Sequence, residues 1–495
     1  MAEAIWKMSA SSLAGAIKSR QLSSEEVIKA LLERISTLDT HTNAFAYVDA
    51  DQALAAAYKA DMAVRNGAEL GLLHGVPVAV KDVIATQGLR TAYGSKLHAE
   101  NVPHADAEVV ARIRKAGGII IGKTTTPEFA HKVLTDSPLH GITRNPWSLE
   151  HSPGGSSGGA AVAAAMGFCS LNLTTDGAGS SRIPAACCGV LGLKPTSGTF
   201  PNEAAPDVFG MQVIGAITRD SADMKLLFSA LVGSGAGDPF SYPVHSEMSD
   251  RPDGSILPGM RIRYVARMGN HLVDEQVSLA TERALARMVE AGAQIVDGPE
   301  ISWHQEAWRV LQRAQQASRF GKRLPLIREQ LDPSLVTCVE EGLSQRVENL
   351  QDALMARSDF YKQLNSVFSY ADVIVSPVLA APPLLVTHGA HQPLKIAGID
   401  QGSLRQAWHS YTTPMNASGH PAISIPCGYT SDGLPLAFQV VGPWRSEALL
   451  IRIAAEFEAL QPWTRDWPTL SSLPPANRCS SVLPEHDETG NPRPR

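Results

Sequence analysis

Two short segments that combine glycine with serine constrain this chain more than any other feature. Residues 152–159 read Ser-Pro-Gly-Gly-Ser-Ser-Gly-Gly, and residues 176–185 read Asp-Gly-Ala-Gly-Ser-Ser-Arg-Ile-Pro-Ala. Glycine adopts backbone conformations that other residues avoid, so both segments predict tight turns. Small residues in a turn let successive N–H groups and serine hydroxyls face one point. This arrangement suits anion binding or a nucleophilic hydroxyl.

Short apolar runs alternate with helical patterns around these segments. Strands are predicted over 76–80, 118–121 and 170–173, and helices over 105–116 and 158–167. Such alternation is typical of α/β proteins with parallel strands. Further strands and helices are predicted over 372–376, 422–425, 436–441, 9–35, 50–65, 272–292 and 446–459. We predict an α/β fold in a single large domain, with a mixed, mostly parallel central sheet covered by helices on both faces.

The chain divides into regions of different character. Residues 1–65 are predicted to form an N-terminal helical layer of the same domain, and residues 66–473 its main body. Within that body, residues 301–370 are helix-rich and more charged, as expected of a peripheral layer or lid. Residues 474–495 are dominated by Pro, Asn, Ser, Glu and Arg, which predicts a disordered tail.

The composition excludes several classes of protein. The 495 residues are 44% hydrophobic and 19% charged, with a net charge of −6. These values are typical of a soluble globular protein and do not favour nucleic-acid binding, which needs a basic face. No apolar run approaches the roughly 18 residues of a membrane span, and the first residues lack the pattern of a signal peptide. A cytoplasmic protein is therefore expected.

Cysteine and histidine do not occur in metal-binding patterns. The six cysteines include no Cys-x-x-Cys pair, and the fifteen histidines include no His-Glu-x-x-His motif. Such spacings would indicate a zinc site. We expect buried reduced thiols, no metal and no organic cofactor.

The first glycine–serine segment is compatible with three known kinds of loop. A plain turn is one. A phosphate loop would need a lysine after its second glycine, and this segment has none. Residues 154–158 fit the Gly-x-Ser-x-Gly nucleophile elbow, but the residues before them, 147–153, are polar and end in proline rather than forming a buried strand. An elbow enzyme would also need a later histidine, and none of the candidates is marked by its surroundings: His388, His391 and His420.

The second segment has the pattern of an oxyanion hole. It follows a predicted strand, and its small residues would let backbone N–H groups point into a cleft beside the Ser180 hydroxyl. Such donors are typically worth about 3 kcal/mol each. Asp176 and Arg182 flank the loop and are expected to hold it by hydrogen bonds. The candidate oxyanion donors are the amides of Gly177, Ala178 and Gly179.

A lysine at the end of an apolar run is the candidate base. Lys81 follows residues 76–80, and a lysine in such a place is expected to be buried. To act as a base it must be neutral, which requires its pKa to fall by roughly 3 units from about 10.4. Desolvation can lower the pKa of a buried amine by 3–5 units, so the requirement can be met.

Together these three segments resemble the amidase signature family. The shared pattern is a lysine after an apolar strand, then Gly-Gly-Ser-Ser-Gly-Gly, then Asp-x-x-Gly-Ser-x-Arg-x-Pro-Ala. Ser156 lies 75 residues after Lys81, and Ser180 lies 24 residues after Ser156. The resemblance covers roughly residues 9–465. Other matching landmarks are residues 122–124, 127–129, 144–147, 189–196 and 421–426.

The resemblance implies a mechanism and a role for each residue. Ser180 would be the acylated nucleophile, and Ser156, reached through a cis peptide bond to Gly155, would relay protons. Lys81 would be the base, and an amide would be hydrolysed through an acyl-enzyme without metal or cofactor. An amidotransferase-type subunit that needs partners is the alternative, and a catalytically silent binding protein with the same fold is a third.

Two departures from the family pattern bear on the substrate contacts and on the type of reaction. The family's frequent asparagine after Gly-Lys-Thr is Thr125 here. Where the glutamyl-tRNA amidotransferase members of the family have Asp-Thr-Gly-Gly-Ser, this chain has residues 176–180 as Asp-Gly-Ala-Gly-Ser, a variant seen in stand-alone hydrolases. This difference favours a hydrolase.

The pocket is expected to bind a hydrophobic or aryl amide, with esters or carbamates (urethanes) as further substrates of an acyl-enzyme. The nearest candidates for its lining are Thr125, Phe129 and Ser181. The surrounding segments supply apolar side chains and few obvious cations: Trp303, Trp308, Leu311, Phe320, Leu335 and Leu379. The expected partner is a small molecule, and the sequence leaves a monomer and a homodimer open.

Overall fold

An eleven-stranded sheet runs through the middle of the computed structural model, which describes residues 5–203, 210–244, 254–303 and 305–470. The strand order among these residues is β1-β3-β2-β6-β8-β7-β14-β15-β11-β9-β10. The strands are β1 (Phe45–Val48), β2 (Pro77–Lys81), β3 (Ile119–Thr124), β6 (Leu171–Asp176), β7 (Leu191–Lys194), β8 (Val213–Thr218), β9 (Arg261–Tyr264), β10 (Gln294–Ile295), β11 (Val373–Pro377), β14 (Ala422–Tyr429) and β15 (Pro435–Val441). The tail predicted at 474–495 lies outside the described residues.

The sheet is mixed in strand direction. Parallel pairing joins β3, β2 and β6 on one side and β11, β9 and β10 on the other. The strands between these groups, and β1 at the edge, pair antiparallel. Each predicted strand is present within a few residues of its expected bounds. The predicted single α/β domain with a mixed central sheet is confirmed.

Helices pack closely on the sheet. Every residue of β2, β3, β6 and β8 is buried, which requires both faces of these strands to be covered. The covering helices are α5 (Glu108–Lys115), α6 (Gly158–Ala165), α7 (Arg182–Cys188), α8 (Ser221–Leu231), α9 (Glu275–Glu290) and α16 (Glu447–Leu460). α6 and α7 contact each other as well as the middle strands, so the two glycine–serine segments start helices that lie together.

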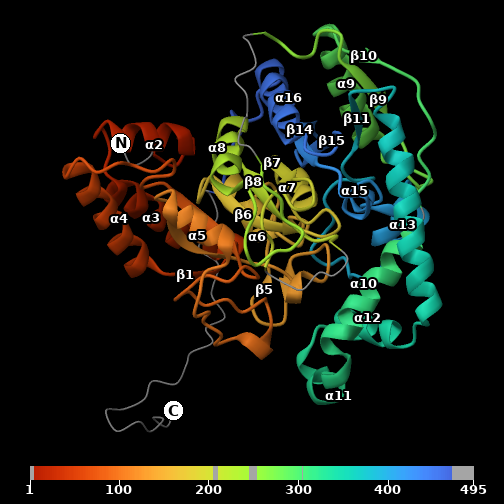
Figure 1. The fold of residues 1–495 in the computed structure, drawn as a ribbon, viewed down its shortest axis with the longest axis horizontal. Helices are drawn as coiled ribbons and strands as arrows, with labels where there is room; N and C mark the ends of the chain where they lie inside the picture. The colour runs from red at the N-terminus through yellow and green to blue at the C-terminus, as the bar shows by residue number, and fades with distance from the viewer. Residues whose placement is uncertain (1–4, 204–209, 245–253, 304, 471–495) are drawn as a thin grey trace.

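The N-terminal layer departs from the expected single helix over 9–35. Two helices occupy this stretch, α2 (Ala10–Lys18) and α3 (Ser24–Thr42). The chain breaks between them because Ser23 and Glu26 form a capping box that starts a new helix. The helix predicted over 50–65 is α4 (Ala50–Arg65), and α2, α3 and α4 lie together at one side of the molecule (Figure 1).

Residues 305–367 form a helical layer at the opposite side (Figure 1). Its helices are α10 (Gln305–Phe320), α11 (Leu324–Ile327), α12 (Pro333–Leu343) and α13 (Val347–Val367). α10 contacts α12 and α13, and it also contacts α15 (Thr413–Ser418). Phe320 and Phe129 belong to a small separate apolar cluster that ties this layer to the rest of the domain.

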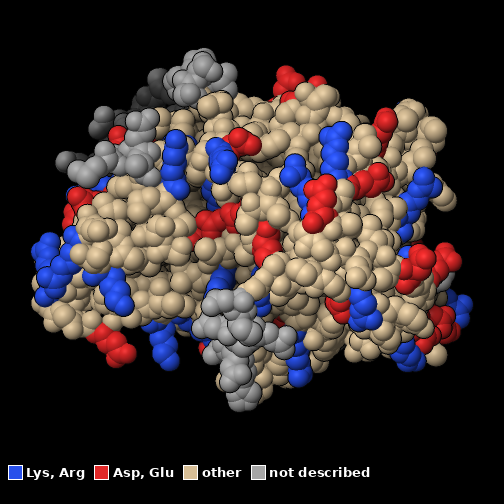
Figure 2. Space-filling view, turned by 90° about the horizontal axis from the view of Figure 1, so that it is seen from above, with Lys and Arg blue, Asp and Glu red and all other residues tan. Residues whose placement is uncertain are grey.

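On the face seen in Figure 2, lysine and arginine are intermingled with aspartate and glutamate, so this face is not the basic surface that nucleic-acid binding needs.

Within the described ranges, no helix combines the length and the apolar character needed to cross a membrane.

Candidate active site

Lys81 is the last residue of β2, where two parallel neighbours also end. It is completely buried, and its Nζ donates to Ser156 Oγ at 2.7 Å and to Thr175 Oγ1 at 3.0 Å. Thr175 lies near the end of β6, which pairs parallel with β2. Because parallel strands bring their carboxyl ends to the same edge, the lysine and the threonine meet there.

The environment of Lys81 favours a neutral amine. Burial lowers the pKa of Lys81 to about 7, and the charge of Asp176 opposes only part of this shift. Burial also lowers the pKa of two other lysines, Lys123 and Lys194, to about 7. Lys123 donates to Thr86 and Thr91 hydroxyls, and Lys194 to a backbone carbonyl. A depressed pKa is therefore shared by three lysines, and the contact with Ser156 distinguishes Lys81.

Three amides of the first glycine–serine loop donate to other groups of the protein. The Gly155–Ser156 peptide bond is cis. Ser157 N donates to the Ser180 carbonyl at 3.2 Å, Gly158 N to Thr135 Oγ1 at 3.1 Å, and Gly154 N to Ser152 Oγ at 3.2 Å. The anion cradle considered for this loop is thus not formed by these three amides. They fix Ser156 in place and join its loop directly to the one that carries Ser180.

The second loop is held by the carboxylate of Asp176. This group accepts from Gly179 N at 2.7 Å, from Ser181 N at 3.1 Å, and from Arg182 through Nε and Nη2 at 3.0 Å each. Gly179 has φ near 115°, and a Cβ there would lie 2.3 Å from Thr412 Oγ1. Glycine is therefore required at this position, and the turn that presents Ser180 is fixed from several sides.

Arg182 connects this loop to distant parts of the chain. Its Nη1 donates to Gln439 Oε1 and its Nη2 to Asn416 Oδ1, both at 2.6 Å. Asn416 Nδ2 in turn donates to the Asp176 carbonyl at 2.8 Å. Burial alone would raise the pKa of the Asp176 carboxyl, but the ion pair and hydrogen bonds with Arg182 hold it well below its ordinary value. The loop-supporting role predicted for Asp176 and Arg182 agrees with these contacts.

Replacing Asp176 with asparagine is expected to destabilise the fold. The change removes the partner of a fully buried guanidinium, and breaking a buried ion pair from one side typically costs about 3–5 kcal/mol. Urea unfolding of the Asp176→Asn variant measures this loss. Glu348→Gln breaks a solvent-exposed pair with Arg346 and is expected to leave the unfolding midpoint unchanged. Equal midpoints for both variants would contradict the prediction.

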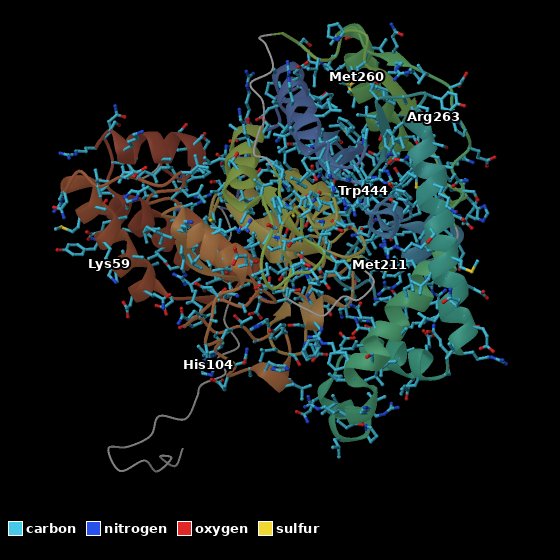
Figure 3. The ribbon with its side chains drawn as sticks, in the orientation of Figure 1. Lys59, His104, Met211, Met260, Arg263 and Trp444 are labelled. Carbon is cyan, nitrogen blue, oxygen red and sulfur yellow. The ribbon has the colours of Figure 1, made fainter. Side chains whose placement is uncertain are left out.

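Ser156 and Ser180 line one cavity of about 70 Å³. Thr175, Gly177 and Ala178 also line it, so the two loops and the end of β6 meet at its floor. Met211, labelled in Figure 3, lines the same cavity. The other residues that line the cavity come from residues 129–133, from α10 and from the segment after β13 (Ile399–Ser403), with Gln212 beside Met211. They are Phe129, Ala130, His131, Lys132, Val133, Trp308, Gln312, Gln315, Gln316 and Arg405.

Of the three predicted pocket residues, the structure places one at the cavity and two away from it. Phe129 lines the cavity and packs on Phe320 with ring centroids 4.7 Å apart. Thr125 does not, because its hydroxyl bonds to Thr143 Oγ1 at 2.7 Å and to backbone carbonyls beside β1. Ser181 does not either, because its buried hydroxyl faces Thr174 Oγ1 at 2.7 Å. The pocket predictions for Thr125 and Ser181 are wrong.

Several cavity residues are not indicated by the sequence. Trp308 is among the apolar candidates, but Thr175, Arg405 and the glutamines of α10 are not. The pairing of β2 with β6 would have indicated Thr175, because it places Thr175 near Lys81. No local pattern marks Arg405, which lies 225 positions after Ser180 in the sequence.

The contacts of Ser156 argue against a nucleophile elbow with a histidine. The hydrogen-bond partner of the Ser156 hydroxyl is Lys81. His420, one of the histidines considered, packs against Phe368 and Trp444 instead. His131 lines the cavity, but burial and the charge of Arg405 lower its pKa to about 3.

Comparison with known proteins identifies the family to which this chain belongs. The Amidase family model matches residues 26–451. An acylamidase of Rhodococcus erythropolis is 34% identical over 468 residues, covering 92% of this chain and 96% of that protein. A glutamyl-tRNA(Gln) amidotransferase subunit of Syntrophobacter fumaroxidans is 31% identical over 469 residues, covering 89% and 94%.

A solved structure supports the same conclusion. A bacterial aryl acylamidase described as an amidase signature enzyme superposes with a TM-score of 0.86 at 27% identity, covering 92% of this chain and 97% of that one. The resemblance that the motifs indicated therefore extends through the whole domain. The chain belongs to the amidase signature family of amide hydrolases.

Proposed function

We propose that this protein hydrolyses amides through a Ser180–Ser156–Lys81 relay and an acyl-enzyme. Neutral Lys81 takes the proton of Ser156, and Ser156 takes that of Ser180. Ser180 then attacks the substrate carbonyl, and Ser156 passes a proton to the leaving amine. Water hydrolyses the ester by the same route. The observation that carries this proposal is the 2.7 Å contact between a buried lysine and Ser156 at the cavity that Ser180 lines.

The oxyanion would be received by the turn that ends in Ser180. Gly177 and Ala178 line the cavity beside the nucleophile. The Gly179 amide already donates to Asp176 Oδ1. We therefore assign the donors to the amides of Gly177, Ala178 and Ser180, which moves the role predicted for Gly179 to its neighbour.

The substrate we propose is a hydrophobic or aryl amide. Phe129, Trp308 and Met211 give the cavity two aromatic surfaces and one apolar surface. Relatives named as acylamidase and aryl acylamidase support this choice. Since an acyl-enzyme can form from any acyl donor that fits, esters and carbamates are proposed as secondary substrates.

A hydrolysis panel tests the proposed function. Purified protein is offered a p-nitroanilide, a p-nitrophenyl ester, an aryl carbamate and an aliphatic primary amide. Release from the anilide at a higher kcat/KM than from the primary amide is expected. Turnover restricted to the primary amide would contradict the aryl preference.

An amidotransferase-type subunit is the second candidate, because the Syntrophobacter fumaroxidans relative carries that name. Such a protein would show little hydrolysis alone and would gain activity with its partners. Anilide hydrolysis by the isolated chain is the result that separates the two candidates.

The pH dependence of hydrolysis should report the titration of Lys81. A base acts only when unprotonated, so kcat/KM is expected to rise with pH and to level off above pH 7, following a pKa of about 7. Below this value the rate should fall about tenfold per pH unit. The measurement is kcat/KM for a p-nitroanilide from about pH 5 to 9. A flat profile over this range would contradict the relay.

A further inference from the structure

A second cavity of about 180 Å³ adjoins the one that holds the two serines. The two cavities share a wall made of five residues: His131, Lys132, Val133, Gln312 and Arg405. A substrate bound at Ser180 can therefore extend past this wall. The charged side chains that line the second cavity indicate which kind of ligand fits there.

Three of the four lysine and arginine side chains that line the second cavity already have carboxylate partners. Lys132 Nζ lies 2.6 Å from Asp136 and 2.7 Å from Asp332. Arg309 pairs with Glu306 at 3.3 Å. Arg313 pairs with Glu306 at 3.0 Å and with Glu341 at 2.7 Å.

Arg405 is the exception. No carboxylate of the described residues lies within 4.0 Å of its guanidinium, which instead donates to the His131 carbonyl at 3.0 Å and lies 5.1 Å from the Trp308 ring centre. Burial, together with the charges of Arg309 and Arg313, lowers the pKa of Arg405 to about 10, while Cys338 and Glu341 oppose the shift, so the group is still charged at neutral pH. Arg405 is partly buried. A partly buried cation with no carboxylate close to it loses hydration that nothing nearby replaces, and an anionic ligand would offset that cost.

Two residues that line the first cavity together with Arg405 carry unsatisfied polar atoms. Trp308 lines the first cavity and is only 4% exposed, yet its Nε1 has no hydrogen-bond partner among the residues that the structure describes. Gln316, 8% exposed, likewise leaves Oε1 without one. Buried indole N–H groups are usually bonded, so the Trp308 N–H is a donor that a bound ligand can satisfy.

We propose that Arg405, assisted by the Trp308 indole N–H, binds a carboxylate carried by the substrate. The inference rests on the proposed amide hydrolysis and names its substrate class: an apolar or aryl amide with a carboxylate on the part that reaches the shared wall. It revises the sequence-based expectation of few cationic anchors. Arginine suits this role because its planar fork matches a carboxylate.

Binding to the Ser180→Ala protein tests the proposal without requiring turnover. Titration calorimetry compares matched ligands: a succinyl anilide with its methyl ester, for a carboxylate on the acyl side, and an N-acyl aminobenzoate with its methyl ester, for one on the amine side. In one of these pairs the carboxylate is expected to bind about 10- to 100-fold more tightly, as for a hydrogen bond to a charged group. Adding Arg405→Gln should reduce that ratio to near one, and adding Arg405→Lys should retain part of it.

Arg309→Gln is the matched control. Arg309 lines the second cavity but not the first, and its partner is Glu306. Its charge acts on Arg405 only from a distance, so its removal should change the ratio far less than Arg405→Gln does. A ratio near one for both ligand pairs, or a ratio that survives Arg405→Gln, would overturn the proposal. Neither result affects the relay, which the anilide assay of the wild-type protein tests separately.

Discussion

Replacing Ser180 with alanine is expected to lower kcat/KM for an anilide by about 10,000-fold or more. The change removes the only atom that the proposed mechanism acylates, and deleting a nucleophile from a relay typically costs most of the catalytic acceleration. Ser180 is almost buried at the cavity floor, and the loss of one hydroxyl there leaves the Asp176–Arg182 support in place. Steady-state kinetics and a thermal melt measure the two effects.

Ser181→Ala provides the matched control for this change. The two serines are adjacent, but the Ser181 hydroxyl bonds to Thr174 and lies outside the cavity. The control variant is expected to keep its activity within about tenfold. Anilide hydrolysis that survives Ser180→Ala would contradict the assignment and would return Ser156 to consideration as the nucleophile.

Replacing Lys81 with methionine is expected to reduce kcat/KM by about 1,000- to 10,000-fold. The side chain keeps a similar length but loses the amine that deprotonates Ser156. The rise of activity through pH 7 should disappear with it, because the group that titrates is gone. Rate–pH profiles of the variant and the wild type measure both effects.

Lys123→Met separates the role of Lys81 from the general effect of removing a buried lysine. Both lysines are fully buried, and burial lowers the pKa of each to about 7, but Lys123 donates to the hydroxyls of Thr86 and Thr91. Its replacement should weaken the fold and keep the rise of activity through pH 7. A Lys81→Met protein that retains the wild-type rate would disprove the proposed base.

The parts of the fold predicted best are those determined by local sequence. β2, β3 and β6 are uniformly buried because both of their faces are covered, and short apolar runs between turn residues reveal such strands. The break between α2 and α3 is not predicted, although Ser23 and Glu26 have the spacing of a capping box. The apolar stripe continues across the break and conceals it, because both helices bury their apolar faces against the same core.

The sequence indicates the three relay residues of the candidate site more clearly than the residues that line its cavity. Lys81, Ser156 and Ser180 stand in recognisable motifs, whereas the roles of Thr125 and Ser181 depend on which way a side chain points. Ser181 is next to Ser180 in sequence, but the helix that starts there turns its hydroxyl toward β6. Arg405 is distinguished because no carboxylate of the described residues lies within 4.0 Å of its guanidinium, and this becomes visible only when distant segments are packed together.

The contacts of Arg182 have a consequence for how this enzyme is made. Two of its partners, Asn416 and Gln439, belong to the last fifth of the chain. During synthesis, the serine loop leaves the ribosome more than two hundred residues before the groups that complete its support. A nascent chain therefore contains Lys81, Ser156 and Ser180 long before the loop of Ser180 can form all of its stabilising contacts. Activity should appear only when the C-terminal strands have been released and have joined the sheet.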